Sequence, residues 1–455
     1  MSRGPRISRD PFEIAIDDLS HDGRGVAHRD GKAVFVRGAL PGERVIALQS
    51  ARHRHFDEAN AVQVLEASPD RVEPKCAHFG QCSGCVLQHL DADQQIQAKQ
   101  RVLVENLQRI GHVAPERLLP PLSAARWGYR RKGRLSVRYV EKKGRTLVGF
   151  REDDPRFVAD IRRCETVVPA IGLHIEALAQ MIDRLDGKRE IAQIEFIVGD
   201  AEAEGAAANG AGQGDGVVAL VLRNLKPLTQ ADRDILIEFA KAHDFAIYLQ
   251  PGGVDSVQPL WPEAGVALSF ALRADGLRLA FEPLDFIQVN AGMNEKMIAT
   301  ALELLAPQPD QRILDLFCGL GNFTLPIARR VAQVVGVEGD AGLVARARAN
   351  AQRNGIDNAR FFATDLTSSL AYEPWLGENF DALLLDPPRS GAEAVLPQLP
   401  LKNIRRIVYV SCHPASLARD AGFLVRERGY TLRAAGVMDM FPHTAHVESI
   451  ALFER

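Results

Sequence analysis

The chain has 455 residues, of which 46% are hydrophobic and 25% charged, and its formal net charge is −3. This length leaves room for about three domains, and the composition is that of an ordinary globular protein. The slight negative charge argues weakly against nucleic acid as a partner, because phosphate-binding proteins usually carry excess positive charge. No apolar run approaches the roughly 18 residues of a membrane span, and no secretory signal is visible, so we expect a cytoplasmic protein without membrane contact.

Residues 1–70 have the pattern of a small β-barrel of the OB type. The segment 12–16 alternates apolar and polar residues, and glycines separate later short strands such as 33–36 and 44–48. Barrels of this kind often bind single-stranded nucleic acid. We therefore expect an RNA-binding module here, by analogy of fold alone.

Residues 71–290 predict a mixed α+β domain. A helix is expected at 93–110, where apolar residues share one stripe and Gly111 ends the helix. Strands are expected at 134–139, 147–150, 194–198, 217–222 and 245–249. The Ala- and Gly-rich tract 201–216 predicts an irregular loop between two of these strands.

Cys76, Cys82 and Cys85 form a compact triplet in this domain, and Cys164 is the nearest candidate for a fourth ligand. Disulfides are not expected in a cytoplasmic protein. Four thiolates fit either a tetrahedral zinc ion or an iron–sulfur cluster. Zinc sites more often consist of two Cys-x2-Cys pairs, so a triplet with a distant fourth cysteine favours iron–sulfur.

A basic stretch between Arg126 and Arg145 is interleaved with Trp127, Tyr129 and Tyr139. A run of charge usually marks only a solvated face. Aromatic rings among the cations favour RNA binding, because bases stack on such rings.

From residue 291 onward, strands and helices alternate. Helices are expected at 294–306, 323–331 and 342–354, and strands at 312–316, 334–338, 360–363, 382–386 and 407–411. This alternation predicts that residues 291–455 form a Rossmann-like α/β domain with a doubly wound parallel sheet. Such sheets bind ligands at the carboxyl ends of their strands.

The first three of these strand ends carry acidic residues and a glycine-rich loop. The residues concerned are Asp315, Gly319, Gly321, Glu338 and Asp365. Glu338 is placed to accept hydrogen bonds from ribose hydroxyls, and Asp365 from an adenine amino group. The segment after Gly321 departs from the dinucleotide signature, and a carboxylate at Asp315 repels a pyrophosphate. S-adenosylmethionine, which has a positive centre and an ammonium group, fits this loop better.

Cys412 follows the strand 407–411, and Asp386 ends the strand 382–386. A thiol at this edge is placed like a nucleophile. If Cys412 faces the ligand, we expect the pKa of its thiol to be lowered. The alternative is a core residue, since a single cysteine at a strand end is more often part of a core. Cys318, in the glycine-rich loop, is expected to be a packed residue.

Two other functions stay open at this point. Asp386-Pro387-Pro388 resembles the loop of adenine N6 methyltransferases, but Arg389 follows where those enzymes usually carry an aromatic residue. The other is an RNA-binding or redox-sensing protein with an inactive C-terminal domain. The intact loop, Asp386 and Cys412 speak against it.

Together these segments resemble the RNA uracil-5 methyltransferase family, and within it the enzymes of bacterial 23S ribosomal RNA. The matching pieces are the barrel, which resembles a TRAM domain, the four cysteines, and the segments 127–130, 286–290, 315–321, 385–391, 411–414 and 443–448. The tRNA branch of the family is expected to lack the barrel and the cysteine triplet, so their presence points to ribosomal RNA.

The resemblance implies a SAM-dependent enzyme whose four cysteines hold a [4Fe-4S] cluster. The ligands would be Cys76, Cys82, Cys85 and Cys164. The S-adenosylmethionine and uracil sites would be lined by Gln288, Phe317, Asn322, Glu338, Asp365 and Asp386, with Cys412 as the nucleophile.

The chemistry of uracil then gives each group a role. The thiolate of Cys412 adds to C6, C5 takes the methyl group, and a base removes the C5 proton. Glu448, between apolar neighbours, is the expected proton acceptor, and Asp386 is expected to bind the uracil edge. Because the base must leave its stack, the expected partner is a single-stranded or loop region of 23S ribosomal RNA, bound by a monomer.

Overall fold

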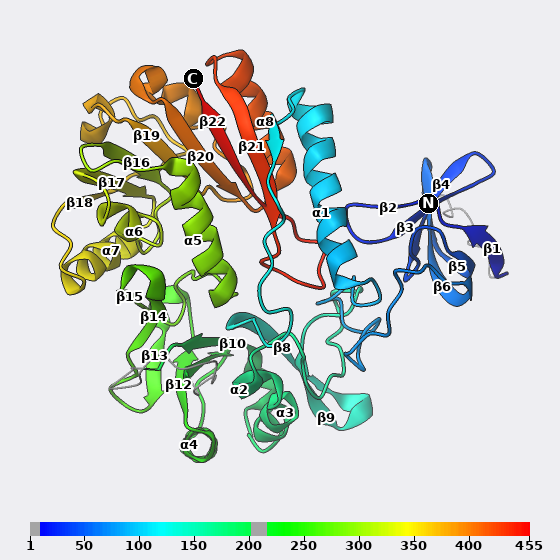
Figure 1. Cartoon of the computed structure of the whole chain (residues 1–455). Helices are drawn as coiled ribbons and strands as arrows, with labels where there is room; N and C mark the ends of the chain where they lie inside the picture. The colour runs from blue at the N-terminus through cyan, green and yellow to red at the C-terminus, as the bar shows by residue number, and fades with distance from the viewer. Residues whose placement is uncertain (1–9, 202–215) are drawn as a thin grey trace.

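The computed structural model describes residues 10–201 and 216–455. Within these ranges the strands form an N-terminal sheet, a central sheet, a two-stranded sheet and a large C-terminal sheet. Figure 1 shows the N-terminal strands (blue) at one end of the molecule, beside the C-terminal sheet and the central part.

The N-terminal sheet has the strand order β1-β5-β6-β4-β3-β2. Its strands are β1 (Phe12–Ala15), β2 (Asp18–Leu19), β3 (Gly25–Arg29), β4 (Lys32–Arg37), β5 (Arg44–Arg52) and β6 (Phe56–Glu66). Alternate residues face a small apolar core that includes Ile14, Val34, Val36 and Val45. The three strands predicted in this part are confirmed.

The central sheet has the order β13-β12-β11-β10-β8-β9. Its strands are β8 (Lys132–Val140), β9 (Arg145–Gly149), β10 (Ile191–Gly199), β11 (Val217–Asn224), β12 (Phe245–Gln250) and β13 (Gln258–Trp261). Helices α3 (Ile175–Asp183) and α4 (Gln230–His243) bury their apolar faces in its core. The predicted loop 201–216 connects the antiparallel neighbours β10 and β11, and its residues 202–215 lie outside the described part of the chain.

The C-terminal sheet has the order β18-β17-β16-β19-β20-β22-β21-β7. Its strands are β16 (Arg312–Leu316), β17 (Gln333–Glu338), β18 (Ala359–Ala363), β19 (Ala382–Leu385), β20 (Arg406–Ser411), β21 (Thr431–Met438), β22 (Glu448–Glu454) and β7 (Arg117–Leu118). Helices α5 (Ala291–Leu305), α6 (Thr324–Ala328) and α7 (Ala341–Arg353) pack with one apolar core of this sheet, and α8 (Pro414–Arg426) packs with another.

The predicted doubly wound sheet is confirmed for β16 to β20, which pair in parallel. An entirely parallel sheet is wrong, because β22 runs antiparallel to both neighbours, β20 and β21. The connection 439–447 is the physical reason. A parallel crossover needs about a dozen residues or more, usually a helix, whereas a short loop returns the chain antiparallel.

The helix predicted at 93–110 forms, but it packs with the C-terminal sheet. It consists of α1 (Ala92–Asn106) and a π-helical turn, Leu107–Gly111. Leu103 and Leu107 are fully buried in the same cluster as residues of β19, β20 and α8, and β7 pairs with β21. Figure 1 shows α1 beside β21. This segment of the expected domain 71–290 therefore completes the C-terminal domain.

Within the described ranges, no helix has both the length and the apolar character needed to cross a membrane.

Leu107→Ala tests whether α1 belongs to the C-terminal core. We expect a loss of about 2–5 kcal/mol in the free energy of unfolding, because the side chain is fully buried and leaves a cavity. Denaturant unfolding followed by the fluorescence of the buried Trp375 measures it. Gln97→Ala, on the exposed face of the same helix, is the control. Equal stability of the two variants would contradict this packing.

Candidate active site

The ends of β19 and β20 meet the start of β22 at one edge of the C-terminal sheet. Because β19 and β20 pair in parallel, Asp386 reaches this edge directly after β19. Ser411 lies opposite Ser449 in the antiparallel pair β20–β22. Continuing this register brings Cys412 beside Glu448. The three predicted catalytic residues are therefore brought together.

Cys412 is half-buried, and the pKa of its thiol is raised to about 11. Burial is the largest cause, and the carboxylates of Glu448 and Asp386 add to it, while Arg389 opposes them. The expected lowered pKa is therefore wrong for the substrate-free protein. The N-terminus of α8 favours a thiolate, but desolvation and two nearby negative charges outweigh it.

The two carboxyl groups beside this thiol titrate near neutral pH. Burial raises the pKa of Asp386 to about 7. Burial and the charge of Asp386 raise the pKa of Glu448 to about 8, against the opposing charges of Lys99 and Arg389. Groups with such pKa values exchange protons readily at physiological pH, as general acid–base chemistry requires.

Cys412 opens onto a groove of about 950 Å³. One wall comes from β2 and the turn after it, including His21, and another from α1, including Lys99. The floor includes Arg130 and His446. The groove thus lies between the N-terminal sheet and the catalytic edge, and it joins segments far apart in the sequence.

Two basic side chains border the thiol and are held by hydrogen bonds. Arg389 Nη2 donates to His446 Nδ1 at 3.1 Å. The Ser416 N–H lies 3.3 Å from His413 Nδ1, and the imidazole caps the N-terminus of α8. Both contacts fix the groove wall around Cys412.

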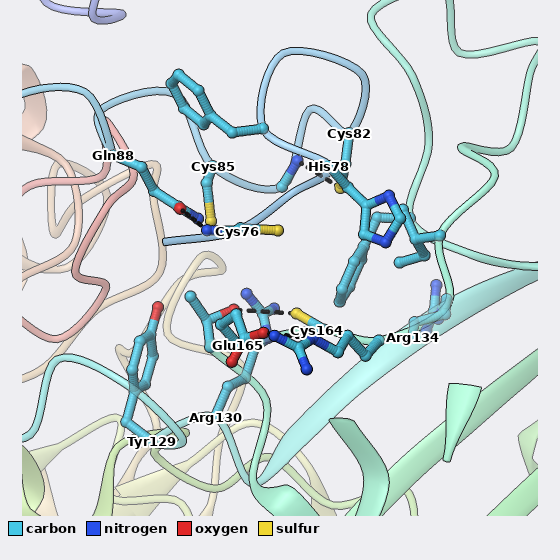
Figure 2. A pocket seen from close by; sticks show the side chains of 16 residues that line it. Cys76, His78, Cys82, Cys85, Gln88, Tyr129, Arg130, Arg134, Cys164 and Glu165 are labelled. Carbon is cyan, nitrogen blue, oxygen red and sulfur yellow. Dashed lines mark hydrogen bonds and ion pairs between the residues drawn. The ribbon is translucent and has the colours of Figure 1, made fainter. Parts of the chain in front are cut away.

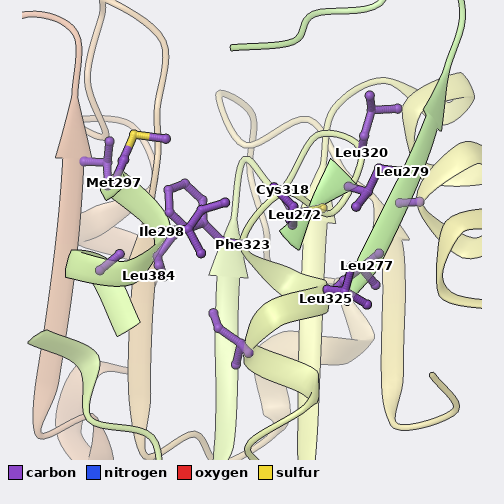
Figure 3. Close-up of a cluster of buried hydrophobic side chains, with 14 of the residues drawn as sticks. Leu272, Leu277, Leu279, Met297, Ile298, Cys318, Leu320, Phe323, Leu325 and Leu384 are labelled. Atoms are coloured by element: carbon purple, nitrogen blue, oxygen red, sulfur yellow. The ribbon is translucent and has the colours of Figure 1, made fainter. Parts of the chain in front are cut away.

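The glycine-rich loop follows β16 in a strained conformation. Phe317 has a φ of +65°, which is costly for a residue with a side chain, and its N–H donates to the Val337 carbonyl at 2.8 Å. The N–H of Gly319 donates to Glu338 at 3.1 Å. Cys318 is buried among apolar side chains, as Figure 3 shows, which confirms it as a packed residue.

Asp315 is completely buried under this loop, and burial raises its pKa to about 8. Thr324 donates a hydrogen bond to Oδ2, whereas Oδ1 has no partner within the described residues. An acceptor without a partner is costly in a protein interior. The site therefore suits a ligand that brings a hydrogen-bond donor. With a pKa of about 8 the Asp315 carboxyl is mostly neutral at pH 7, so the expected repulsion of a pyrophosphate by its charge is wrong for the ligand-free protein.

The other residues predicted to bind S-adenosylmethionine lie in the loop itself, just before α5 and after β18. Asn322 exchanges two side-chain hydrogen bonds with Asn294 of α5, at 2.8 and 2.9 Å. The carbonyl of Gln288 accepts a hydrogen bond from Arg131 at 3.0 Å. Asp365 is exposed after β18, and the hydrogen bonds from Thr367 and Ser368 lower its pKa to about 2.

The four predicted metal-binding cysteines line one cavity of about 180 Å³. They are Cys76, Cys82, Cys85 and Cys164, and Figure 2 shows their sulfur atoms around this space. Burial, with smaller contributions from neighbouring cysteines, raises the pKa of Cys82 to about 11 and of Cys85 to about 12. In the described part of the chain, no three or more His, Cys, Asp or Glu side chains form a group that could hold a metal ion. The sulfur atoms surround a space and do not form a preformed single-ion site.

The basic stretch 126–145 is divided between the interior and the surface. Arg131 is buried, donates to the Gln288 carbonyl, and lies 3.6 Å from Asp200, so an RNA-binding role is wrong for this residue. Tyr129 is also buried. Trp127 stacks on His443 with ring centroids 3.9 Å apart. Arg134, Arg138, Lys142 and Lys143 are exposed, and RNA binding stays a prediction for them.

Lys99 is the residue near this site that sequence reasoning missed. It is buried in α1 and pairs with the buried Asp439 at 2.6 Å. A signal was present, because Lys99 occupies the apolar stripe of α1 between Ile96 and Leu103. A lysine at such a position needs a buried anionic partner.

Two parts of the chain match known families. Residues 271–455 match the family described as tRNA (Uracil-5-)-methyltransferase, and residues 9–48 match the TRAM domain. The chain is 64% identical over 453 residues to the 23S rRNA (uracil(1939)-C(5))-methyltransferase RlmD of Xanthomonas campestris pv. campestris (strain 8004), covering 99% of this chain and 98% of that protein. It is 65% identical over 453 residues to RlmD of Stenotrophomonas maltophilia (strain K279a), with the same coverage.

Among solved structures, the chain resembles Pyrococcus abyssi tRNA (uracil-54, C5)-methyltransferase in complex with S-adenosyl-L-homocysteine. The TM-score is 0.72 at 24% identity, covering 97% of this chain and 100% of that one, which shows a shared fold. The protein is thus a methyltransferase with an N-terminal TRAM domain. It belongs to the RNA uracil-5 methyltransferase family, and its full-length similarity is to RlmD.

One argument from the sequence needs correction. A structure described as a tRNA enzyme matches almost the whole chain, so the barrel is not confined to enzymes of ribosomal RNA. The barrel alone therefore does not distinguish the two substrates, and the argument from the cysteine triplet stays a prediction.

The raised pKa of Cys412 can be tested by alkylation. At pH 9 both carboxyl groups beside the thiol are ionised, so Asp386→Asn or Glu448→Gln removes a negative charge and lowers the pKa of the thiol. We expect iodoacetamide to label Cys412 severalfold faster in either variant, measured by peptide mass mapping. Asp310→Asn, exposed before β16, is the control. An unchanged or slower rate in both test variants would overturn this electrostatic account.

Proposed function

We propose that this enzyme transfers the methyl group of S-adenosylmethionine to C5 of a uracil in 23S ribosomal RNA. The observation that carries the proposal is the meeting of Cys412, Asp386 and Glu448 at one sheet edge, open to a large groove. The full-length relatives are named as enzymes of this reaction. The same relationship supports a cytoplasmic location, because ribosomal RNA is made there. We also propose that the enzyme acts as a monomer, since the groups of the site all come from one chain.

The reaction begins at the thiol of Cys412. Its proton passes to a neighbouring carboxylate, and the sulfur forms a bond to C6 of uracil, which places negative charge on C5 and O4. C5 then attacks the methyl group in line, while the bond from that carbon to the sulfonium sulfur breaks and leaves S-adenosylhomocysteine. Asp386, beside the thiol, hydrogen-bonds the uracil edge.

Elimination completes the cycle. Glu448 takes the proton from C5, the electrons of that C–H bond re-form the C5–C6 double bond, and the thiolate of Cys412 leaves. A carboxyl group with a pKa of about 8 suits this step, since it is basic enough to accept the proton and releases it near neutral pH.

The methyl donor fits the loop after β16. Glu338 ends β17 and Asp365 follows the neighbouring β18, while Phe317 and Asn322 belong to the loop itself. Gln288 lies just before α5, whose Asn294 exchanges hydrogen bonds with Asn322. The unpartnered Oδ1 of Asp315 supports a donor with N–H groups at this place.

The groove beside the thiol supports binding of unpaired RNA. A uracil must leave its stack to reach Cys412, and a loop or single strand makes this step less costly. The N-terminal sheet forms a wall of the same groove. We assign this sheet the role of holding the RNA on either side of the target base.

We also propose that the cysteine cavity holds a [4Fe-4S] cluster. Four thiols around one space are the donor set of such a cluster, and a compact triplet with a distant fourth cysteine favours iron–sulfur over zinc. Cys76, Cys82, Cys85 and Cys164 would hold it. The cluster would cross-link the loop 76–85 to Cys164, and the methylation steps above need no redox chemistry.

RNA that contains 5-fluorouracil tests the covalent step. Fluorine cannot leave C5 as a proton, so the wild-type enzyme should accumulate a methylated adduct that survives denaturing electrophoresis. Cys412→Ala should form none, while still binding RNA in a gel-shift assay. With ordinary RNA, wild-type product digested to nucleosides should contain 5-methyluridine. An adduct formed by Cys412→Ala, or N6-methyladenosine as the product, would reject the proposal.

Metal analysis after anaerobic purification tests the cluster. We expect about four iron atoms per chain, absorbance in the visible blue, and loss of most iron in Cys85→Ser. Cys318→Ala, which changes a cysteine outside the cavity, should keep its iron. One zinc per chain, or full iron in Cys85→Ser, would contradict this assignment.

A further inference from the structure

The loop 439–447, which connects β21 to β22, leads directly into Glu448 and is held by the N-terminal half of the chain. The Pro442 carbonyl accepts a hydrogen bond from the Tyr129 hydroxyl at 3.2 Å. Gln95 Oε1 accepts the His443 N–H at 2.9 Å. These contacts hold His443 at a φ of +68°, a conformation unfavourable for a residue with a side chain. Residues of the N-terminal half, Gln95 and Tyr129, therefore help to set the direction in which the chain enters β22.

The strongest single contact to this loop comes from Lys99. Its Nζ donates to Asp439 Oδ1 at 2.6 Å and to the Phe441 carbonyl at 2.9 Å. Both side chains of the ion pair are almost completely buried, at 3% and 4% exposure. A buried ion pair usually adds little net stability compared with apolar residues, so a role in the site explains it better than a role in folding.

Lys99 also faces the active site. It borders the groove onto which Cys412 opens. It is close enough to Glu448 for each charge to influence the other group. The ammonium therefore both binds the loop that leads to Glu448 and acts on the Glu448 carboxyl through its charge.

We propose that Lys99 is a positioning residue that holds Glu448 at the catalytic edge and favours its ionised, proton-accepting form. This inference rests on the proposed function, in which Glu448 removes the C5 proton. Lys99 touches neither the uracil nor the methyl donor in this account. It acts through the loop 439–447 and through its charge.

Among the charged groups around Glu448, Lys99 differs from the others because it is a buried cation. Asp386, after β19, and the thiol of Cys412, after β20, both oppose ionisation of Glu448 when they are negative. Arg389 favours ionisation but is exposed and donates to His446. Asp439 is paired with Lys99 itself. Removing Lys99 therefore removes a shielded positive charge that solvent does not replace.

Lys99→Met tests the inference through the elimination step. With ordinary uracil-containing RNA, a smaller ionised fraction of Glu448 leaves the methylated adduct on Cys412 for longer. If the pKa of Glu448 rises by about one unit, adduct decay slows about tenfold at pH 7 and recovers at high pH, because each unit changes the ionised fraction tenfold. Decay is followed in single-turnover reactions across pH. Lys402→Met, exposed at the opposite end of β20, should match the wild type.

A double variant tests whether the effect of Lys99→Met comes only from misfolding. Lys99→Met combined with Asp439→Leu removes both buried charges, so no unpaired carboxylate remains in the interior. Trapping by 5-fluorouracil RNA does not need Glu448, so both variants should still form that adduct. A purely structural role for Lys99 would lower the rate equally at every pH and leave the pH midpoint unchanged, and that result would overturn the inference.

Glu448→Gln separates this inference from the proposed function. If Glu448 is the base, Glu448→Gln accumulates the adduct with ordinary RNA at every pH. Rapid turnover by Glu448→Gln would reject the base itself. Accumulation in Glu448→Gln together with a wild-type pH midpoint in both Lys99 variants would reject only the role of Lys99.

Discussion

The antiparallel return of β22 between β20 and β21 is the constraint on which the site depends. It brings the start of one strand to the end of another, so Glu448 lies beside Cys412 at a single edge. Parallel strands alone would place Glu448 at the opposite edge of the sheet. The same closeness has an electrostatic cost, because the carboxylates of Glu448 and Asp386 add to burial in raising the pKa of the Cys412 thiol. In the proposed mechanism the thiol therefore gives its proton to a neighbouring carboxylate and is not a permanent thiolate.

The N-terminal half of the chain builds the catalytic edge as much as the C-terminal half does. α1 and β7 complete the C-terminal domain, and the backbone N–H groups of Val86 and Leu87, directly after Cys85, donate to the His443 carbonyl at 2.9 and 3.0 Å. The loop that bears the cysteine triplet therefore contacts the loop that leads to Glu448. This connection gives a structural reason for a cysteine-rich segment in an enzyme whose chemistry needs no electron transfer.

Local pattern predicted much of the fold, whereas pairing between distant segments could not be read from it. The strand at 312–316 was predicted with its observed bounds, because its apolar residues Ile313, Leu314 and Leu316 are followed directly by a glycine-rich loop. The insertion of β22 and the docking of α1 depend on contacts between distant segments. Asp386 and Cys412 were found because each follows a strand, whereas Glu448, which begins β22, was found from its apolar neighbours and the need for a base. The sign of the Cys412 pKa shift depends on neighbours that only the folded chain brings close.

The central claim is that sulfur of Cys412 bonds to the uracil ring while Glu448 faces the proton to be removed. A structure of Glu448→Gln with its RNA, trapped after methyl transfer, tests this most directly. The account expects a bond from Cys412 Sγ to C6, a new methyl group on C5, and residue 448 within hydrogen-bond distance of the C5 side. Density that joins C6 to another residue, or places residue 448 away from the ring, would contradict it.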